Sequence, residues 1–322
     1  MNNKILGMGN AVLDILTETT EEYLKNNKLD KGSMVLVEQE ESDKIISDII
    51  PKKKDSGGSV ANTTVGISIL GGDSLFCGKV KNDELGIDFE KNMQNAGTRF
   101  LCQKSENGLP TARCLVLVTP DGERTMQTFL GASTTLEEND IKEEFFQDVN
   151  FLLIEGYLWS SVSARNAIQK AIEISKKKDI KIFFSLSDPG LAKMYRNDFL
   201  KFIDNSVDVL IGNEKEYYEV FQNEKHNTLL KDVSNLVDVG LMTQGDKGVM
   251  LFKNEEIMNI GAPKINNVID TTGAGDMFAA GLLFKLQRNE SFEKSAEFGC
   301  KTAAKIITQF GARPTNQFKS LI

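Results

Sequence analysis

The chain has 322 residues, with 40% hydrophobic and 26% charged residues, so it is long enough for one large α/β domain or two small ones with a sizeable core. Its net charge of −8 argues against a nucleic acid or an anionic membrane surface as the main partner. No apolar run is long enough for a signal peptide or a membrane span, so we expect a cytoplasmic protein.

The predicted elements alternate between strands and helices along the chain. Short apolar runs that suit buried parallel strands alternate with segments of helical spacing, two of which are stopped by glycine. This alternation predicts an α/β fold built from βαβ units around a central, mostly parallel sheet flanked by helices. The expected strands are 4–9, 73–80, 150–156, 181–187 and 206–213, and the expected helices are 59–72, 85–96, 163–177 and 277–286.

A second group of expected strands does not fit this alternation. The segment 112–129 indicates two strands joined at a Pro-Asp-Gly turn, and 11–18 and 32–39 could be further short strands. Together they could form a small β-sheet apart from the main one. We expect it to act as a discontinuous lid, about residues 10–40 and 98–130, over the crevice at the carboxyl ends of the parallel strands.

The cysteines and the single histidine narrow the possible chemistry. None of the four cysteines forms a C-x-x-C pair, so neither a zinc site nor a disulfide framework is predicted. The only histidine, His226, lies in a polar stretch that we expect to be a surface loop. A Ser-His-Asp triad, a Cys-His pair and a multi-histidine metal site are therefore not expected, and a general base should be a carboxylate.

The strongest functional motif is D-T-T-G-A-G-D at 270–276, directly before an apolar helix. Its small residues Gly273, Ala274 and Gly275 let backbone N–H groups approach an anion closely, and the helix dipole adds positive potential there. Asp276 would then stand beside the anion, where it could take a proton from an attacking hydroxyl. An anion hole with an adjacent base suits phosphoryl transfer. The alternative is a glycine-rich turn with an aspartate as N-terminal helix charge.

This motif resembles the C-terminal signature of the PfkB or ribokinase family, and S-G-G-S-V-A-N at 56–62 resembles its N-terminal signature. The resemblance extends over essentially the whole chain. It implies a ribokinase-like fold as a single kinase domain, 1–322, with a β lid. It also implies that Asp276 is the catalytic base, that the small residues before it form the anion hole, and that the enzyme uses ATP and Mg²⁺.

Two further stretches match the nucleotide side of that family. Asn213 and Glu216 fit its N-x-x-E motif, which acts on Mg²⁺ and phosphate largely through water. A helix capping box is the alternative for this pair, and both roles can hold together. Thr243, Gly245 and Gly248 resemble the nucleotide-binding turn, for which an ordinary glycine turn is the alternative. The resemblance adds Gly273 and Gly275 to the nucleotide-binding set.

The acceptor side is predicted from residues after the first strand and around the N-terminal signature. An ionised Asp14 can accept hydrogen bonds from two neighbouring hydroxyls, as on a ribose. Each residue taken alone is better explained as part of a turn, a strand end or a helix start. The set that matches the family's substrate-binding positions is Asn10, Asp14, Gly57, Gly58, Ser59 and Asn62. Arg124, in the expected lid, could reach substrate or phosphate, although a surface ion pair is the favoured interpretation.

Five stretches, 9–15, 184–195, 207–221, 241–248 and 303–314, resemble adenosine kinases more than ribokinases or fructokinases. This implies phosphorylation of the 5′-hydroxyl of adenosine to give AMP. The alternative is a sugar kinase acting on ribose, fructose or a related sugar. A catalytically silent relative that only binds nucleoside or sugar as a sensor has no support, because Asp276 is present.

A small molecule is the expected partner, without nucleic acid or membrane, and the protein could be a monomer or a homodimer. The apolar residues Met34, Leu36, Leu115 and Leu117 could wall a pocket for the base.

Overall fold

The computed structural model describes residues 3–223 and 225–322, and within these ranges nine strands form one large sheet. In spatial order they are β14 (Glu256–Ile260), β13 (Val249–Lys253), β12 (Val239–Thr243), β11 (Val209–Asn213), β10 (Lys181–Ser185), β9 (Val149–Glu155), β1 (Lys4–Met8), β5 (Ser74–Cys77) and β6 (Arg99–Phe100). Neighbours from β6 to β12 are parallel, whereas β13 and β14 are antiparallel. The predicted central, mostly parallel sheet is confirmed.

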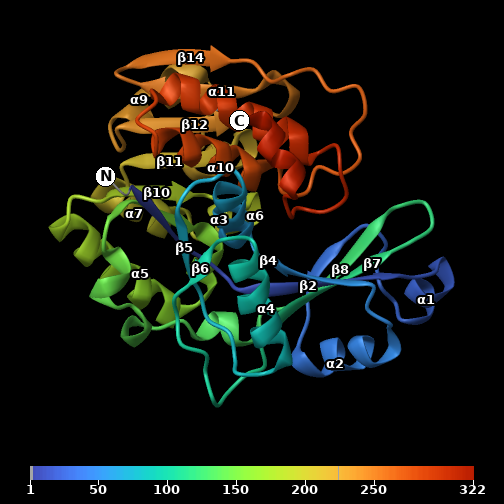
Figure 1. Ribbon diagram of the computed structural model, residues 1–322. Helices are drawn as coiled ribbons and strands as arrows, with labels where there is room; N and C mark the ends of the chain where they lie inside the picture. The colour runs from blue at the N-terminus through green and yellow to red at the C-terminus, as the bar shows by residue number, and fades with distance from the viewer. Residues whose placement is uncertain (1–2, 224) are drawn as a thin grey trace.

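Helices cover both faces of this sheet, so the central strands are apolar along most of their length. In β9, for example, Leu153 packs in one core, whereas Leu152 and Ile154 pack in the other. One face carries α3 (Ser59–Ile69), α4 (Glu84–Asn95), α10 (Ala274–Leu286) and α11 (Phe292–Ile306). The other carries α5 (Val162–Lys177), α6 (Pro189–Met194), α7 (Arg196–Ser206), α8 (Glu214–Phe221) and α9 (His226–Ser234) (Figure 1). His226 thus begins a helix instead of lying in a loop.

A smaller sheet of five strands, counted over the described part of the chain, projects from one side of the main body (Figure 1). Its order is β3 (Met34–Leu36), β8 (Arg124–Phe129), β7 (Ala112–Val118), β2 (Val12–Glu18) and β4 (Lys53–Gly57), and it carries α1 (Glu21–Asn26) and α2 (Gln39–Asp48). The expected separate sheet is confirmed. Strand β4 was not predicted, because its sequence K-K-D-S-G has no apolar alternation.

The two faces of the small sheet have different surroundings. Leu115 and Leu117 are fully buried in a core that also contains Leu24 of α1 and Ile45 of α2. Since side chains alternate along a strand, the neighbours of these leucines, such as Cys114, lie on the opposite, open face. The expectation that Leu115 and Leu117 wall a substrate pocket is therefore wrong.

Met34 and Leu36 do belong to the open face. The strand register aligns Leu36 with Thr128, Cys114, Asp14 and Asp55 in one row across the sheet. Met34 lies two residues away on the same face, and the two apolar side chains are 52% and 60% exposed. The open face thus combines exposed apolar surface with the carboxylate of Asp14.

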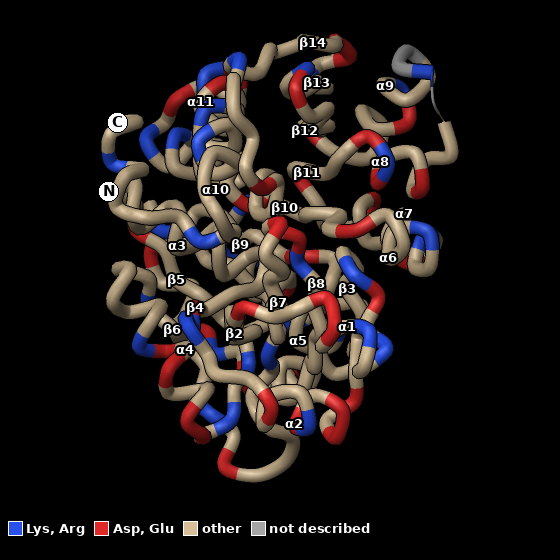
Figure 2. The backbone as a smooth tube through the Cα atoms, turned by 90° about the vertical axis from the view of Figure 1, so that its right-hand side faces the viewer, with Lys and Arg blue, Asp and Glu red and all other residues tan. Residues whose placement is uncertain are grey.

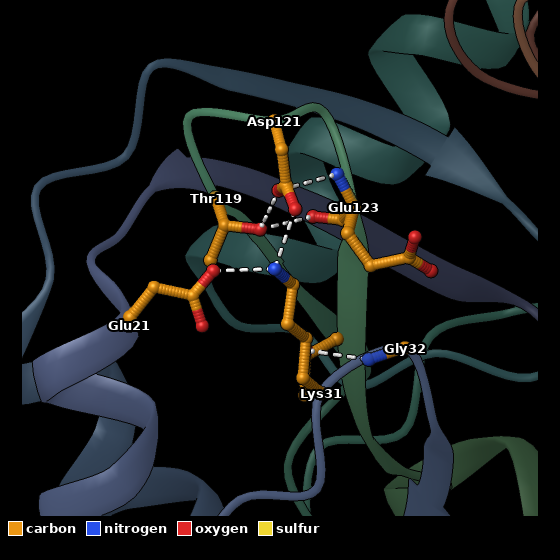
Figure 3. A network of polar contacts seen from close by, with 7 residues as sticks. Glu21, Lys31, Gly32, Thr119, Asp121 and Glu123 are labelled. Atoms are coloured by element: carbon orange, nitrogen blue, oxygen red, sulfur yellow. Dashed lines mark hydrogen bonds and ion pairs between the residues drawn. The ribbon is translucent and has the colours of Figure 1, made fainter.

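The tip of the small sheet is held together by a polar network (Figure 3). Nζ of Lys31 lies 2.5 Å from Oδ2 of Asp121 in the β7–β8 turn, and it also pairs with Glu21 of α1. The hydroxyl of Thr119 donates a 2.6 Å hydrogen bond to the other oxygen of Asp121. Because the network joins three segments that are separated in sequence, the β7–β8 hairpin, α1 and the loop between α1 and β3 form one structural unit.

Charge is spread over the whole molecule, with Lys and Arg interleaved among Asp and Glu (Figure 2). Across residues 3–223 and 225–322, no helix combines the length and the apolarity that a bilayer crossing requires.

Candidate active site

The candidate site lies where the strand order of the large sheet reverses. From β1 the chain first adds β5 and β6 on one side, and then places β9 on the other. In open α/β sheets, the carboxyl ends of the strands at such a switch point form the ligand-binding crevice. Here those ends carry Asn10 after β1 and Glu155 in β9, and the N-terminus of α3 lies against them.

Asp276, in the first turn of α10, meets the N-terminal signature directly. Its Oδ1 accepts a 2.7 Å hydrogen bond from the hydroxyl of Ser59, and its Oδ2 accepts a 3.1 Å bond from the amide of Asn62. Burial raises the pKa of Asp276 to about 6, although both hydrogen bonds favour the ionised form. The two signatures, more than 200 residues apart, thus form one constellation around a carboxylate that titrates near neutral pH.

The N-terminus of α10 is open to an anion. Gly273, at the N-cap, has φ of +80°, and a Cβ there would lie 2.7 Å from the backbone of Ala312. Glycine is therefore required both by the backbone conformation and by the approach of the C-terminal segment. No side chain caps this helix, and a Cβ on Gly275 would meet open space. The N–H of Ala274 donates to the carbonyl of Thr271 at 3.2 Å, and the N–H groups that follow it in the first turn suit an anion at this point.

A small cavity of about 90 Å³, lined by both polar and apolar side chains, adjoins this helix start. It has room for a phosphate-sized group or for ordered waters. Its lining includes Ser59, Thr63, Ser185, Ser187, Gly212, Asn213, Glu216, Thr243, Gly275 and Asp276. Strand register explains part of this set, because Asn213 and Thr243 are paired at the ends of β11 and β12. The sequence analysis placed Ser185 and Ser187 in the expected strand 181–187 but did not identify them as site residues; Ser185 ends β10 and Ser187 lies just beyond it.

The glycine turn after β12 lies beside this cavity but does not line it. Gly245 begins a short 3₁₀ turn, Gly245–Lys247, and Gly248 follows it with φ of +99°. The backbone N–H of Gln244 donates a 2.8 Å hydrogen bond to the carbonyl of Gly248, which closes the turn.

Asn213 and Glu216 form the capping box that was considered as their alternative role. Glu216 accepts from the backbone N–H of Asn213 at 2.8 Å and from its amide at 2.6 Å, and the side chain of Asn213 accepts from the N–H of Glu216. Burial raises the pKa of Glu216 to about 7. Because both carboxylate oxygens are engaged, the pair fits a hydrated Mg²⁺ held through water better than a directly ligated one. The hydroxyl, amide and carboxylate oxygens in the cavity lining are the hard donors that Mg²⁺ prefers.

The predicted acceptor residues also converge at the crevice. A Cβ on Gly57 would lie 2.3 Å from Oδ2 of Asp14, and one on Gly58 would lie 2.3 Å from the carbonyl oxygen of Asn10. Both glycines are thus needed because other groups approach their backbone. Burial, and then the neighbouring carboxylate of Asp55, raise the pKa of Asp14 to about 7.

Glu155 is a buried residue of the site that the sequence analysis missed. It is 1% exposed, and its two carboxylate oxygens accept the backbone N–H groups of Asn10 at 2.7 Å and Val60 at 2.9 Å. Burial raises its pKa to about 7, against the effect of these hydrogen bonds. It ties the loop after β1 to the start of α3. The sequence feature that could have identified Glu155 is a carboxylate at the end of the apolar run that forms β9.

Arg124 and Arg313 supply positive charge to the crevice. Arg124 lies 3.1 Å from Asp270, its guanidinium stands 5.0 Å from the ring centre of Phe310, and its side chain is only 12% exposed. The expected ion pair exists, but it is buried and not on the surface. The Nε and Nη2 atoms of Arg124 have no hydrogen-bond partner within the described residues.

Arg313, from the C-terminal segment, contacts Ser56 and approaches Asn62. Only tertiary structure reveals that contact.

Comparison with known proteins gives the same family throughout. The pfkB family carbohydrate kinase model matches residues 34–318. Two solved structures, an adenosine kinase from Sinorhizobium meliloti and a probable sugar kinase from Rhizobium etli, are each 31% identical and cover 99% of this chain. They are covered to 98% and 97% of their own length, and both superpose with a TM-score of 0.89.

A curated relative carries a different substrate in its name. The 5-dehydro-2-deoxygluconokinase of Geobacillus thermodenitrificans is 25% identical over 263 residues, and the match covers 78% of each chain. The relatives therefore agree on phosphoryl transfer to a hydroxyl and differ in the acceptor.

Proposed function

Because this chain belongs to the PfkB family of carbohydrate kinases, we propose that it transfers the γ-phosphoryl group of ATP to the 5′-hydroxyl of adenosine, giving AMP. The observation that carries the proposal is the open face of the small sheet. There, exposed apolar side chains stand beside a carboxylate suited to a ribose diol.

Asp276 is the proposed general base. Ser59 and Asn62 hold its carboxylate beside the open start of α10, so one group can orient and deprotonate the 5′-hydroxyl next to the phosphate. The pKa of about 6 leaves it mostly ionised at pH 7 yet basic enough to accept a proton.

The backbone of Gly273, Ala274 and Gly275 is proposed as the anion hole for the transferring group. Asn213, Thr243, Gly245 and Gly248 are proposed to position the nucleotide along the ends of β11 and β12. Glu216 would hold Mg²⁺ through water, and the bound cation would neutralise charge on the phosphates. Arg124 has two free guanidinium nitrogens that could donate to a phosphate oxygen when the small sheet closes.

The acceptor would be gripped by Asp14, the backbone at Gly57 and Gly58, and the side chains of Asn10 and Asn62. Asp14 would accept hydrogen bonds from the 2′- and 3′-hydroxyls. Closure of the small sheet, the proposed lid at about 10–40 and 98–130, would exclude water, which otherwise competes as phosphoryl acceptor.

The base preference follows from the apolar row on the open face. Met34 is aligned with Met126, Val116 and Leu16 by the strand register. A purine laid over this row would bury apolar surface at about 25 cal/mol per Å², which a free sugar would forgo.

A sugar kinase is the second candidate, and the relative from Geobacillus favours it. The ribose-gripping residues do not by themselves require a base. A gluconate-type acceptor carries a carboxylate, which Asp14 and Asp55 would repel if it occupied the position proposed for the ribose diol.

Product analysis tests the proposal. The protein is incubated with ATP, Mg²⁺ and adenosine, and the products are separated by chromatography. We expect AMP and ADP in equal amounts, with no AMP when adenosine is omitted. ADP formed only in the presence of a sugar would exclude adenosine as the acceptor and leave the sugar kinase.

A further inference from the structure

Arg313 joins elements that are remote in sequence. It follows α11 in the C-terminal segment, and its Nη1 lies 3.5 Å from Oδ1 of Asn62 in α3. Its Nη2 contacts the hydroxyl of Ser56 in β4 and lies 3.6 Å from Sδ of Met93 in α4. Burial lowers the pKa of Arg313 to about 10, so it stays protonated at neutral pH. The positively charged guanidinium of Arg313 therefore contacts both ends of the N-terminal signature, residues 56–62.

The contact with Asn62 determines how its amide is oriented. The oxygen of that amide faces Arg313, and its nitrogen donates to Oδ2 of Asp276. A flipped amide would place NH₂ against the guanidinium and oxygen against the carboxylate, so that both contacts would be repulsive. Arg313 thus favours the single orientation in which Asn62 supports the proposed base.

The same cation lies near Asp14, because its Nη2 contacts Ser56, which directly follows Asp55 in β4, and the strand register pairs Asp55 with Asp14. The charged and titratable groups that face this carboxylate come from five further segments: Asp55 in β4, Cys114 in β7, Arg124 in β8, Asp276 in α10 and Arg313 in the C-terminal segment. Arg124 already pairs with Asp270. Of the two arginines, Arg313 exerts the larger opposing effect on the raised pKa of Asp14.

We propose that Arg313 is a positioning residue for phosphoryl transfer, which orients the Asn62 amide toward Asp276 and places a positive charge near Asp14. The proposal deepens the proposed function, since it assumes the roles of Asp14 and Asp276 given there. Arg313 itself need not touch either substrate.

The first test uses the ligand-free protein, so it does not depend on the identity of the acceptor. Asp14 is titrated by ¹³C NMR in protein labelled at the aspartate carboxyl carbon, with its signal assigned from Asp14→Asn. Arg313→Met should move the Asp14 midpoint upward by about one pH unit, and Arg313→Lys should leave it close to wild type. An unchanged midpoint in Arg313→Met would overturn the charge role.

The second test separates charge from geometry by kinetics with adenosine. Lysine keeps the charge but cannot reach Asn62 and Ser56 with one planar fork. We expect Arg313→Lys to lower kcat about tenfold or more while the acid side of the pH profile of kcat/KM stays in place. Arg313→Met should lower kcat/KM further and move that limb to higher pH, with KM for ATP nearly unchanged.

The matched control is Arg288→Met, because Arg288, just beyond the C-terminal end of α10, donates to the backbone carbonyls of Phe284 in α10 and of Gly71 after α3. It should alter neither the Asp14 titration nor kcat. Wild-type kcat in Arg313→Lys would overturn the orienting role. If the wild-type protein fails to phosphorylate adenosine, the acceptor is wrong, while the ligand-free titration still decides whether Arg313 controls Asp14.

Discussion

The hydroxyl of Ser59 lies 2.7 Å from Oδ1 of Asp276, which joins the start of α3 to the start of α10 across 217 positions of sequence. This contact places the proposed base in the crevice at the carboxyl ends of the parallel strands. The helix start that precedes it is the natural position for the transferring phosphoryl group.

Asp276→Asn should lower kcat by roughly 10²–10⁴-fold, the usual contribution of a general base. The amide has nearly the same shape but cannot accept the proton, so ATP binding should survive. Steady-state kinetics and ATP titration measure the two quantities. Asp238→Asn, an exposed aspartate paired with Lys181, serves as control. A variant that keeps more than about half of wild-type kcat would remove Asp276 from the mechanism.

Glu216→Gln should raise the Mg²⁺ concentration needed for half-maximal activity more than it changes the thermal midpoint. The glutamine can still accept one hydrogen bond in the capping box, but it loses the charge that would attract a hydrated cation. Glu219→Gln, in the same helix and outside the cavity lining, is the control. A lower midpoint with an unchanged Mg²⁺ titration would mean that capping is the whole role of Glu216.

Glu155→Gln should flatten the dependence of stability on pH. The folded protein holds Glu155 with a pKa of about 7, above the ordinary 4.5. Between these values the folded state binds the proton more tightly than the unfolded state, so stability is fully present below pH 4.5 and declines toward pH 7. The decline from this group should be on the order of 1–3 kcal/mol.

Thermal unfolding from pH 5 to 8 measures the effect, with Glu173→Gln on the exposed side of α5 as control. Asp14 and Glu216 contribute in the same direction, so the slope should shrink without vanishing. An identical slope in Glu155→Gln and wild type would show that Glu155 titrates normally.

Hydrogen exchange in the β7–β8 hairpin, residues 112–129, should slow when adenosine is bound. The hairpin carries part of the open face and is tied at its tip to Lys31, so closure over a ligand should protect it as one unit. The comparison is between ligand-free protein and protein saturated with adenosine, read by mass spectrometry. Equal exchange in both states would indicate a rigid sheet that does not gate the site.

The sequence predicted those features that local pattern determines. Apolar runs at 150–156 and 206–213 became β9 and β11, and the two glycine-containing motifs that the sequence singled out lie together at Asp276. Strand β4 escaped prediction, because its pairing with β2 and not its own composition makes it a strand. Leu115 and Leu117 were assigned to the wrong face, since alternation fixes which residues share a face but not which face meets the core.

Glu155 and Arg313 were missed for a related reason. An apolar run identifies a strand, but it does not show that the carboxylate at its end accepts two backbone N–H groups from other segments. Arg313 lies 251 positions from Asn62, and no local pattern links them. Long-range contacts of this kind need the packed fold.

The most direct test of the central claim is a panel of acceptors at matched ATP and Mg²⁺: adenosine, inosine, guanosine, ribose, fructose and 5-dehydro-2-deoxygluconate. Asp14→Ala, measured alongside, should lower kcat/KM for adenosine and spare KM for ATP. We predict the highest kcat/KM for adenosine, because only a nucleoside covers the apolar row beside Asp14. Faster turnover of a free sugar or of the sugar acid than of every nucleoside would contradict the adenosine assignment.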